Sequence, residues 1–317
     1  MWHAFRTLPA AAWTVLAVLA ANAGAAPLAY VPNEKSGTVS VIDTATDAVV
    51  RQLPAGKRPR GIAVDPAGRR LYLSDAGTNS LLTLDLTGGA VRTTPLGKSP
   101  EGVYVSRDGK LVAIAVEESN SVTLVNAATG AQVADIQVEG KNPEHAVFSP
   151  DGRWLLVSAE NAEQVDVIDV AQRKQVGAIG VGLRPRGIGF APDGRLAYVA
   201  SELVNTVFVI DMASRKAIAR IPAGKNANGI AVHPSGKQVY VSNGTDGSVM
   251  VIDTATNTVA ATIPVGKRPW NMALTPDGSR LYVANGRSNS VSVIDTASAR
   301  KIADITVGEL PWGVVIQ

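Results

Sequence analysis

Short apolar runs, in which Val, Ile, Leu and Tyr dominate, alternate along the chain with clusters of Gly, Pro, Asn and Asp. One stretch shows the pattern clearly, with apolar runs at residues 229–232, 238–243, 248–253 and 258–264. Runs of β-branched and aromatic residues of this length, separated by turn residues, are typical of β-strands. The pattern therefore predicts an all-β protein whose strands come in groups of four.

These groups repeat along the chain, each marked by the tripeptide Val-Ile-Asp or a variant of it. The tripeptide recurs at intervals of 41 to 43 residues and ends at Asp43, Asp85, Asn126, Asp169, Asp211, Asp253 and Asp295. A period in the low forties, built from short strands, is typical of β-propeller blades. We predict a seven-bladed β-propeller with four-stranded blades, formed by residues 26–317.

Turn residues within the repeats support this interpretation. Between the first and second runs lie turns such as Pro150-Asp151-Gly152, in which Pro presets φ and Gly takes a positive φ. The Asp of Val-Ile-Asp is expected to accept hydrogen bonds from the turn that follows it. Both features are predicted to be structural rather than functional.

The two ends of the chain predict how the ring closes. Residues 28–32 match the second strand of a blade, whereas residues 313–317 match a first strand. One blade must therefore combine three N-terminal strands with one C-terminal strand, in a three-plus-one clasp.

Residues 1–25 are predicted to be a cleavable signal peptide. His3 and Arg6 provide a basic start, residues 10–21 form an apolar run, and small residues follow at candidate cleavage sites. The apolar run is too short to span a bilayer comfortably. We expect the mature chain in the periplasm, without a membrane span.

Composition narrows the range of partners. The 30 basic and 27 acidic residues nearly balance, so a dedicated nucleic-acid binder is not expected. The chain has no cysteine, which excludes disulfides and thiolate metal sites. We expect a monomer that is held together by packing alone.

Positions that differ between blades, on a scaffold that otherwise repeats, are the candidates for function. The loop that leads into each first strand, here called the leading loop, ends one residue after a proline position. At that residue the seven blades carry Arg60, Glu101, Glu144, Arg186, Asn228, Trp270 and Trp312. We expect these side chains to gather at one mouth of the central channel, charged over four blades and aromatic or amide over three.

Two further residues belong to this set, because His145 and Asn271 stand where five blades have Gly. A ligand contact and a channel-filling hydrogen-bond network are both open interpretations. Behind this set, the ends of the second strands are expected to carry Asn33, Asp75, Glu117, Glu160, Glu202, Asn243 and Asn285.

Aromatic and basic residues of the leading loops offer two more hypotheses. Trp270 and Trp312 belong to neighbouring blades and could form a stacking platform, or they could plug the channel. Lysines recur in the same loops and could form an anion-binding ring, or could serve solubility alone; they are Lys57, Lys98, Lys141, Lys225 and Lys267.

No catalytic constellation is present in the sequence. The three histidines include one in the leader, and no Gly-x-Ser-x-Gly elbow or phosphate-binding loop is found. We therefore predict no catalytic and no metal-ligating residues. The alternative that stays open is a hydrolase in which Glu101, Glu144 and Glu160 hold a hard cation.

The repeated strand sequences carry a family resemblance. Residues 239–243 (Val-Tyr-Val-Ser-Asn) and 281–285 (Leu-Tyr-Val-Ala-Asn), each followed by Val-Ile-Asp, resemble the YVTN-type β-propeller repeat. The seven repeats, the leader and residues 141–152 resemble the β-propeller proteins associated with PQQ-dependent catabolism. That resemblance implies a periplasmic accessory role in alcohol oxidation, with a quinoprotein dehydrogenase or a cytochrome as partner.

The leading interpretation is thus a non-catalytic binding or scaffold propeller that contacts a protein partner or a small molecule at the channel mouth. No cofactor is predicted; PQQ and a divalent metal stay open without a supporting motif. The alternatives are a metal-assisted, lactonase-like hydrolase or lyase, and a binder of polyanions or nucleic acid.

Overall fold

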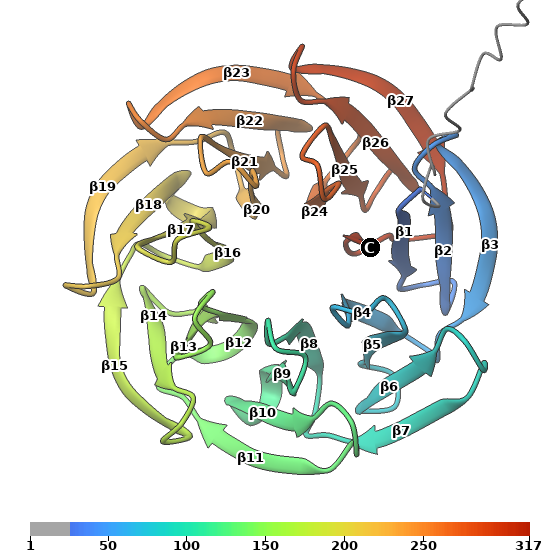
Figure 1. The fold of residues 1–317 in the computed structure, drawn as a ribbon. Coiled ribbons are helices and arrows are strands. Elements are labelled where there is room, and N and C mark those ends of the chain that lie inside the picture. The colour runs from blue at the N-terminus through green and yellow to red at the C-terminus, as the bar shows by residue number, and fades with distance from the viewer. Residues whose placement is uncertain (1–25) are drawn as a thin grey trace, which may run out of the picture.

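Seven four-stranded antiparallel sheets surround a central channel, in a computed structural model that describes residues 26–317 (Figure 1). The all-β, seven-bladed prediction is confirmed. The predicted signal peptide, residues 1–25, lies outside the described residues. Within residues 26–317, no helix combines the length and hydrophobicity that a membrane crossing requires.

The blades are numbered along the chain, and their strands run from the channel to the rim. Blade 1 contains β28 (Val315–Ile316), β1 (Leu28–Asn33), β2 (Thr38–Asp43) and β3 (Ala48–Pro54). Blade 2 contains β4 (Pro59–Val64), β5 (Arg70–Asp75), β6 (Ser80–Asp85) and β7 (Val91–Pro95). Blade 3 contains β8 (Pro100–Val105), β9 (Leu111–Val116), β10 (Ser121–Asn126) and β11 (Gln132–Gln137).

The remaining blades follow the same order. Blade 4 contains β12 (Lys141–Phe148), β13 (Trp154–Asn161), β14 (Gln164–Asp169) and β15 (Lys174–Gly180). Blade 5 contains β16 (Pro185–Phe190), β17 (Leu196–Ser201), β18 (Thr206–Asp211) and β19 (Lys216–Pro222). Blade 6 contains β20 (Ala227–Val232), β21 (Gln238–Asn243), β22 (Ser248–Asp253) and β23 (Thr258–Pro264). Blade 7 contains β24 (Pro269–Leu274), β25 (Arg280–Asn285), β26 (Ser290–Asp295) and β27 (Arg300–Thr306).

The hydrophobic core lies between blades. One cluster joins Leu156 and Val165 of blade 4 to Phe208 and Ile210 of blade 5, and similar clusters fill the other junctions. Side chains on the second and third strands alternate between the two faces of their sheet, so both neighbouring blades receive apolar contacts. Each blade therefore buries its apolar side chains against both of its neighbours.

The predicted turn chemistry is present. The Asp43 carboxylate accepts a hydrogen bond of 2.8 Å from the backbone N–H of Ala45, and Asp253 does the same for Ala255 at 2.9 Å. Gly152 has a φ of +72°, the left-handed conformation that a residue with a side chain adopts only with strain. These residues are structural, as expected.

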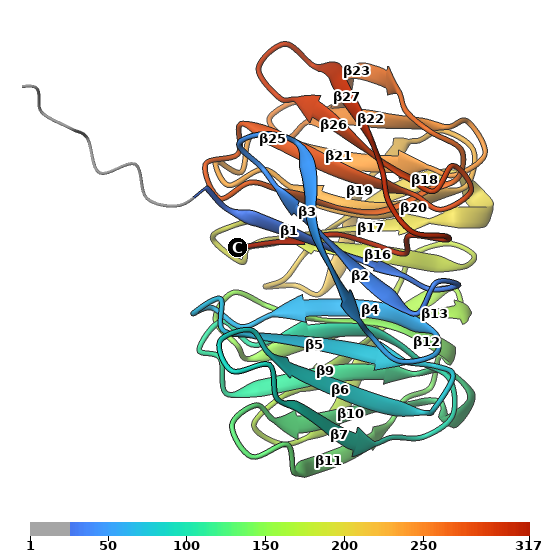
Figure 2. The ribbon, with the colours of Figure 1, turned by 90° about the vertical axis from the view of Figure 1, so that its right-hand side faces the viewer.

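The clasp is also confirmed. Ala29 pairs with Ile316 and Tyr30 with Val315, so the C-terminal segment runs beside β1 (Figure 2) and lies on the channel side of blade 1 (Figure 1). The N–H of Leu28 donates a hydrogen bond of 2.8 Å to the carbonyl oxygen of Gln317. Regular pairing covers only two residues of β28, so the closing strand is shorter than the sequence pattern suggested.

Candidate functional site

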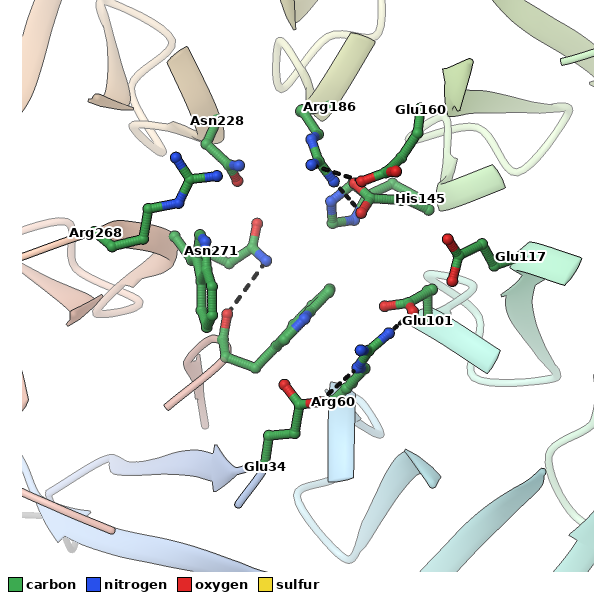
Figure 3. A pocket seen from close by; sticks show the side chains of 13 residues that line it. Glu34, Arg60, Glu101, Glu117, His145, Glu160, Arg186, Asn228, Arg268 and Asn271 are labelled. Carbon is green, nitrogen blue, oxygen red and sulfur yellow. Dashed lines mark hydrogen bonds and ion pairs between the residues drawn. The ribbon is translucent and has the colours of Figure 1, made fainter. Parts of the chain in front are cut away.

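A cavity of about 230 Å³ occupies one mouth of the channel (Figure 3). All nine residues predicted for the mouth line it: Arg60, Glu101, Glu144, His145, Arg186, Asn228, Trp270, Asn271 and Trp312. Four more residues complete the lining: Glu34, Glu117, Glu160 and Arg268. The residues are brought together as expected, and their role in binding stays a prediction.

An irregularity at the start of each inner strand directs these side chains into the channel. In β4, Pro59 pairs with Asp75 and regular pairing resumes only at Ile62, so the residues between lie outside the ladder. The glycine that follows the channel-facing residue has no room for a side chain. In β16, a Cβ on Gly187 would lie 2.5 Å from the carbonyl oxygen of Asn228 in the next blade.

His145 is accommodated by one departure from this pattern and by a glycine in the next blade. Pairing in β12 resumes one residue earlier than in β4, at His145 itself. The neighbouring inner strand has Gly102, where a Cβ would lie 3.0 Å from Nδ1 of His145. The same nitrogen shares a hydrogen bond of 2.8 Å with the hydroxyl of Tyr104 on β8. The imidazole is therefore held by blade 3 and is 2% exposed.

Seven residues were expected at equivalent positions at the ends of the second strands, and in three blades this assignment was wrong by one position. Strand pairing makes Val116, Ala159 and Ser201 equivalent to Asp75, because each lies opposite the proline that opens its inner strand. The glutamates expected there follow one position later, at the level of Glu34. They are Glu117, Glu160 and Glu202.

This offset of one residue changes the direction of the side chain, because adjacent residues of a strand point to opposite sides. Asp75 faces its leading loop and accepts hydrogen bonds from the N–H groups of Lys57 and Arg58, at 2.9 and 2.8 Å. Glu34, one position beyond that level in blade 1, faces the channel and was missed. The spacing to Val-Ile-Asp carries the signal that would have found it, since Asp43 lies ten positions after Asn33 and Asn126 lies ten positions after Val116.

Arg60 forms the first ion-pair cluster of the mouth. Its Nε lies 3.0 Å from Oε1 of Glu34, and its guanidinium also pairs with the buried carboxylate of Glu101. Arg58 reaches the same Glu34 oxygen at 2.7 Å. Three adjacent blades thus contribute to one cluster whose charges compensate each other.

Arg186 forms the second cluster, in the deeper part of the mouth. It is 8% exposed and pairs with Glu144, with Glu160 at 2.7 Å and with Glu202 at 2.7 Å. Burial alone would lower the pKa of Arg186, but the carboxylates around it raise that pKa above its ordinary value. Arg186 therefore stays charged and holds three glutamates together.

Two further arginines complete the second cluster. Arg184 lies 2.7 Å from Glu160 and 3.3 Å from Glu202. Arg268 reaches Glu202 at 2.9 Å from two blades away, across the leading loop of blade 6. Both arginines occupy the leading-loop residue just before the proline. The cluster consequently extends from blade 4 to blade 7.

Glu144 and His145 have protonation states set by burial. Burial raises the pKa of Glu144 to about 7, although Arg186 acts in the opposite direction and the nearby Glu160 adds to the rise. Burial, assisted by the charge of Arg186, lowers the pKa of His145 to about 3. At neutral pH the imidazole is uncharged, and Glu144 can take up or release a proton.

The opposite side of the mouth carries uncharged side chains beside Arg268, whose charge is compensated by Glu202 (Figure 3). The Trp312 indole reaches across the channel from blade 1 to blade 4, where its ring centroid lies 5.7 Å from that of His145. The Trp270 indole lies over Gly286, where a Cβ would come within 2.5 Å of the ring. The aromatic partner of Trp312 within residues 26–317 is thus His145 rather than Trp270, which favours the channel-plug interpretation for Trp312.

Comparison with known proteins shows which family this chain matches. A family model described as lactonase, seven-bladed β-propeller, matches residues 21–131 and 173–305. The chain belongs to this lactonase family. The match omits residues 132–172, and this segment carries Glu144, His145 and Glu160, so the blade 4 part of the site must be argued from this chain alone.

Solved structures show the same fold. Hydrazine synthase of Kuenenia stuttgartiensis is 24% identical, with a TM-score of 0.77, and the alignment covers 84% of this chain and 92% of that one. A putative 6-phosphogluconolactonase of Bacteroides fragilis is 20% identical, with a TM-score of 0.76 and coverages of 94% and 99%. A similar protein of Bacteroides uniformis is 21% identical, with a TM-score of 0.75 and coverages of 92% and 99%. No curated protein matches the chain.

In this lactonase-family propeller, the three carboxylates considered for a hard cation are engaged by arginines. Glu101 is paired with Arg60, and Glu144 and Glu160 are paired with Arg186. Among residues 26–317, no group of three or more His, Cys, Asp or Glu side chains is arranged to hold a metal ion. The three glutamates considered for a hard cation therefore form arginine clusters instead.

The lysines of the leading loops lie outside the cavity. Each of the five is exposed, and none lines the mouth in the described chain: Lys57, Lys98, Lys141, Lys225 and Lys267. Their suggested role in attracting anions therefore stays a prediction for the exposed rim, and it does not extend to a ligand inside the cavity.

Proposed function

We propose that this protein hydrolyses a small lactone at the channel mouth, with Glu144 as the general base. The observation that carries the proposal is a buried carboxyl group at the cavity wall whose pKa is raised to about 7. A general base is most effective when its pKa lies near the working pH. Membership of the lactonase family supports the choice of reaction.

The reaction needs no group beyond water and the side chains of the mouth. Glu144 takes a proton from water while the water oxygen attacks the lactone carbonyl carbon. The ring C–O bond then breaks, and the proton passes from Glu144 to the departing alkoxide, giving a hydroxy acid. The Asn228 amide forms no hydrogen bond within the described chain, so it is available to donate to the carbonyl oxygen that becomes negative.

The test is lactone hydrolysis followed by acid release at constant pH, across a panel of lactones. For the wild type, kcat/KM should rise with pH through about 7, because the deprotonated form of Glu144 is the active one. Glu144→Gln should lower kcat by roughly 10²-fold or more and remove that pH dependence.

Glu118→Gln is the matched control, because Glu118 is exposed beside the mouth and does not line the cavity. It should retain wild-type rates. Equal rates for Glu144→Gln and the wild type, or no hydrolysis of any lactone, would exclude the proposal.

A second candidate is the periplasmic accessory role in PQQ-dependent alcohol catabolism that the YVTN-type resemblance implies. One surface feature favours protein docking. Leu183 stands where five leading loops carry Lys, and it is 45% exposed. Leu203 and Val204 of the adjoining 3-10 helix η2 (Glu202–Val204) are 56% and 38% exposed. Together they form an apolar area on the rim of blade 5.

This role can be tested by cross-linking and capture from a periplasmic extract of cells grown on an alcohol. The wild type should recover a dehydrogenase or a cytochrome, and Leu183→Lys, which restores the residue of the other blades, should recover much less. Equal recovery with both proteins would count against docking at this area.

A further inference from the structure

The arginines at the mouth are already neutralised by carboxylates. Arg60 is shared by Glu34 and Glu101, Arg186 by three glutamates, and Arg268 is bound to Glu202. Five arginines in or beside the cavity face six carboxylates: Glu34, Glu101, Glu117, Glu144, Glu160 and Glu202. A phosphate or carboxylate entering this space would compete with those glutamates for every guanidinium.

Glu117 is the glutamate of the mouth without an arginine partner in residues 26–317. Its carboxylate accepts hydrogen bonds from Ser99 Oγ at 2.8 Å and from Asn142 Nδ2 at 3.5 Å, and it points into the cavity (Figure 3). A carboxylate in this state repels an anion and accepts hydrogen bonds from hydroxyl groups.

The two asparagines of the cavity, which lie beside Arg268, can form further hydrogen bonds. Asn228 is 6% exposed, its side-chain amide forms no hydrogen bond within the described chain, and Figure 3 shows it facing the cavity. Asn271 donates one long hydrogen bond of 3.4 Å to the carbonyl oxygen of Trp312. The amide atoms of Asn228 are open to the cavity, where water or a ligand can form their hydrogen bonds. The Trp270 indole beside them offers a face for stacking a ring.

We infer that the ligand of the mouth is an uncharged, hydroxyl-bearing ring of monosaccharide size. This inference rests on the proposed function, for which it specifies the substrate class as a neutral sugar lactone rather than a phosphorylated one. The cavity of about 230 Å³ equals the space of about eight water molecules at roughly 30 Å³ each, which suits a single small ring. Asn228 and Asn271 bind ring oxygens, Trp270 stacks on the ring, and Glu117 accepts a hydroxyl hydrogen bond.

The test measures binding without turnover, with the lactam analogue of glucono-1,5-lactone as the neutral probe and its 6-phosphate as the anionic one. Calorimetry with the wild type should show at least tenfold tighter binding of the neutral lactam. Asn228→Ala and Trp270→Ala should each weaken that binding about tenfold or more, and Lys98→Ala on the exposed rim should leave it unchanged. Circular dichroism spectra and melting curves show that each variant is folded.

The outcomes separate this inference from the proposed function. Binding of the neutral lactam without hydrolysis of any lactone supports the ligand class and removes the enzymatic role. Hydrolysis or binding that favours the phosphorylated compound overturns the ligand class and keeps the enzymatic role. Preference for an alkylammonium probe over the neutral lactam also overturns it, since Glu117 would then recognise a cation.

Discussion

Deletion of residues 312–317 is expected to lower the melting temperature by roughly 5–10 °C. The deletion removes the strand that closes the ring, together with the pairs Ala29 with Ile316 and Tyr30 with Val315. It also removes Val314, which is 5% exposed and packs between blades 7 and 1. A buried valine contributes about 2 kcal/mol and each hydrogen bond about 1 kcal/mol, so the total loss is on the order of 5 kcal/mol.

The deletion should also promote aggregation, because β1 becomes an edge strand with unpaired backbone groups. Trp312→Ala in the full-length chain is the control, since it removes the channel-spanning indole and keeps the closing strand. It should show the smaller drop when both are compared by calorimetry and size-exclusion chromatography. An unchanged transition in the deleted protein would contradict the clasp as a source of stability.

Arg186→Met is expected to lower the free energy of unfolding by about 3–5 kcal/mol at pH 8. The substitution keeps an unbranched side chain, although a shorter one, and leaves Glu144, Glu160 and Glu202 without their shared cation. Without Arg186, the folded-state pKa of Glu144 should rise further above its value in the unfolded chain. A carboxyl group shifted upward costs stability as pH rises, so the defect should shrink when the pH is lowered from 8 to 5.

Urea unfolding at the two pH values measures both effects. Arg184→Met is the matched control, because Arg184 contacts Glu160 and Glu202 as well, yet its side chain is 33% exposed. Exposed ion pairs contribute about 1 kcal/mol or less. Equal destabilisation by the two substitutions, or a defect that grows on acidification, would show that Arg186 does not hold the buried cluster together.

The fold could be predicted from the sequence because its signals are local. Strand runs, turns such as Pro150-Asp151-Gly152 and the caps of Val-Ile-Asp each depend on residues close together in the chain. The period then set the number of blades. The chain begins with a second-type strand and ends with a first-type strand, and this predicted the three-plus-one clasp without any knowledge of contacts.

The site could be predicted in part. Comparing blades located nine of the thirteen residues that line the cavity, because variation at two repeated positions is visible in the sequence. Glu34 was missed, and Glu117, Glu160 and Glu202 were assigned to the wrong position, because an offset of one residue does not disturb the apolar pattern. Strand pairing, which hydrogen bonds between strands define, revealed that offset.

Local residue patterns thus specified the ring of seven blades, its closure and the residues at its mouth. Contacts between blades decided the chemistry there. Glu202 and Arg268 are 66 residues apart and lie 2.9 Å from each other, and Glu144 has a raised pKa because neighbouring blades bury it. Coulomb interactions and desolvation depend on distances and burial in three dimensions, so residue types along the chain do not specify them.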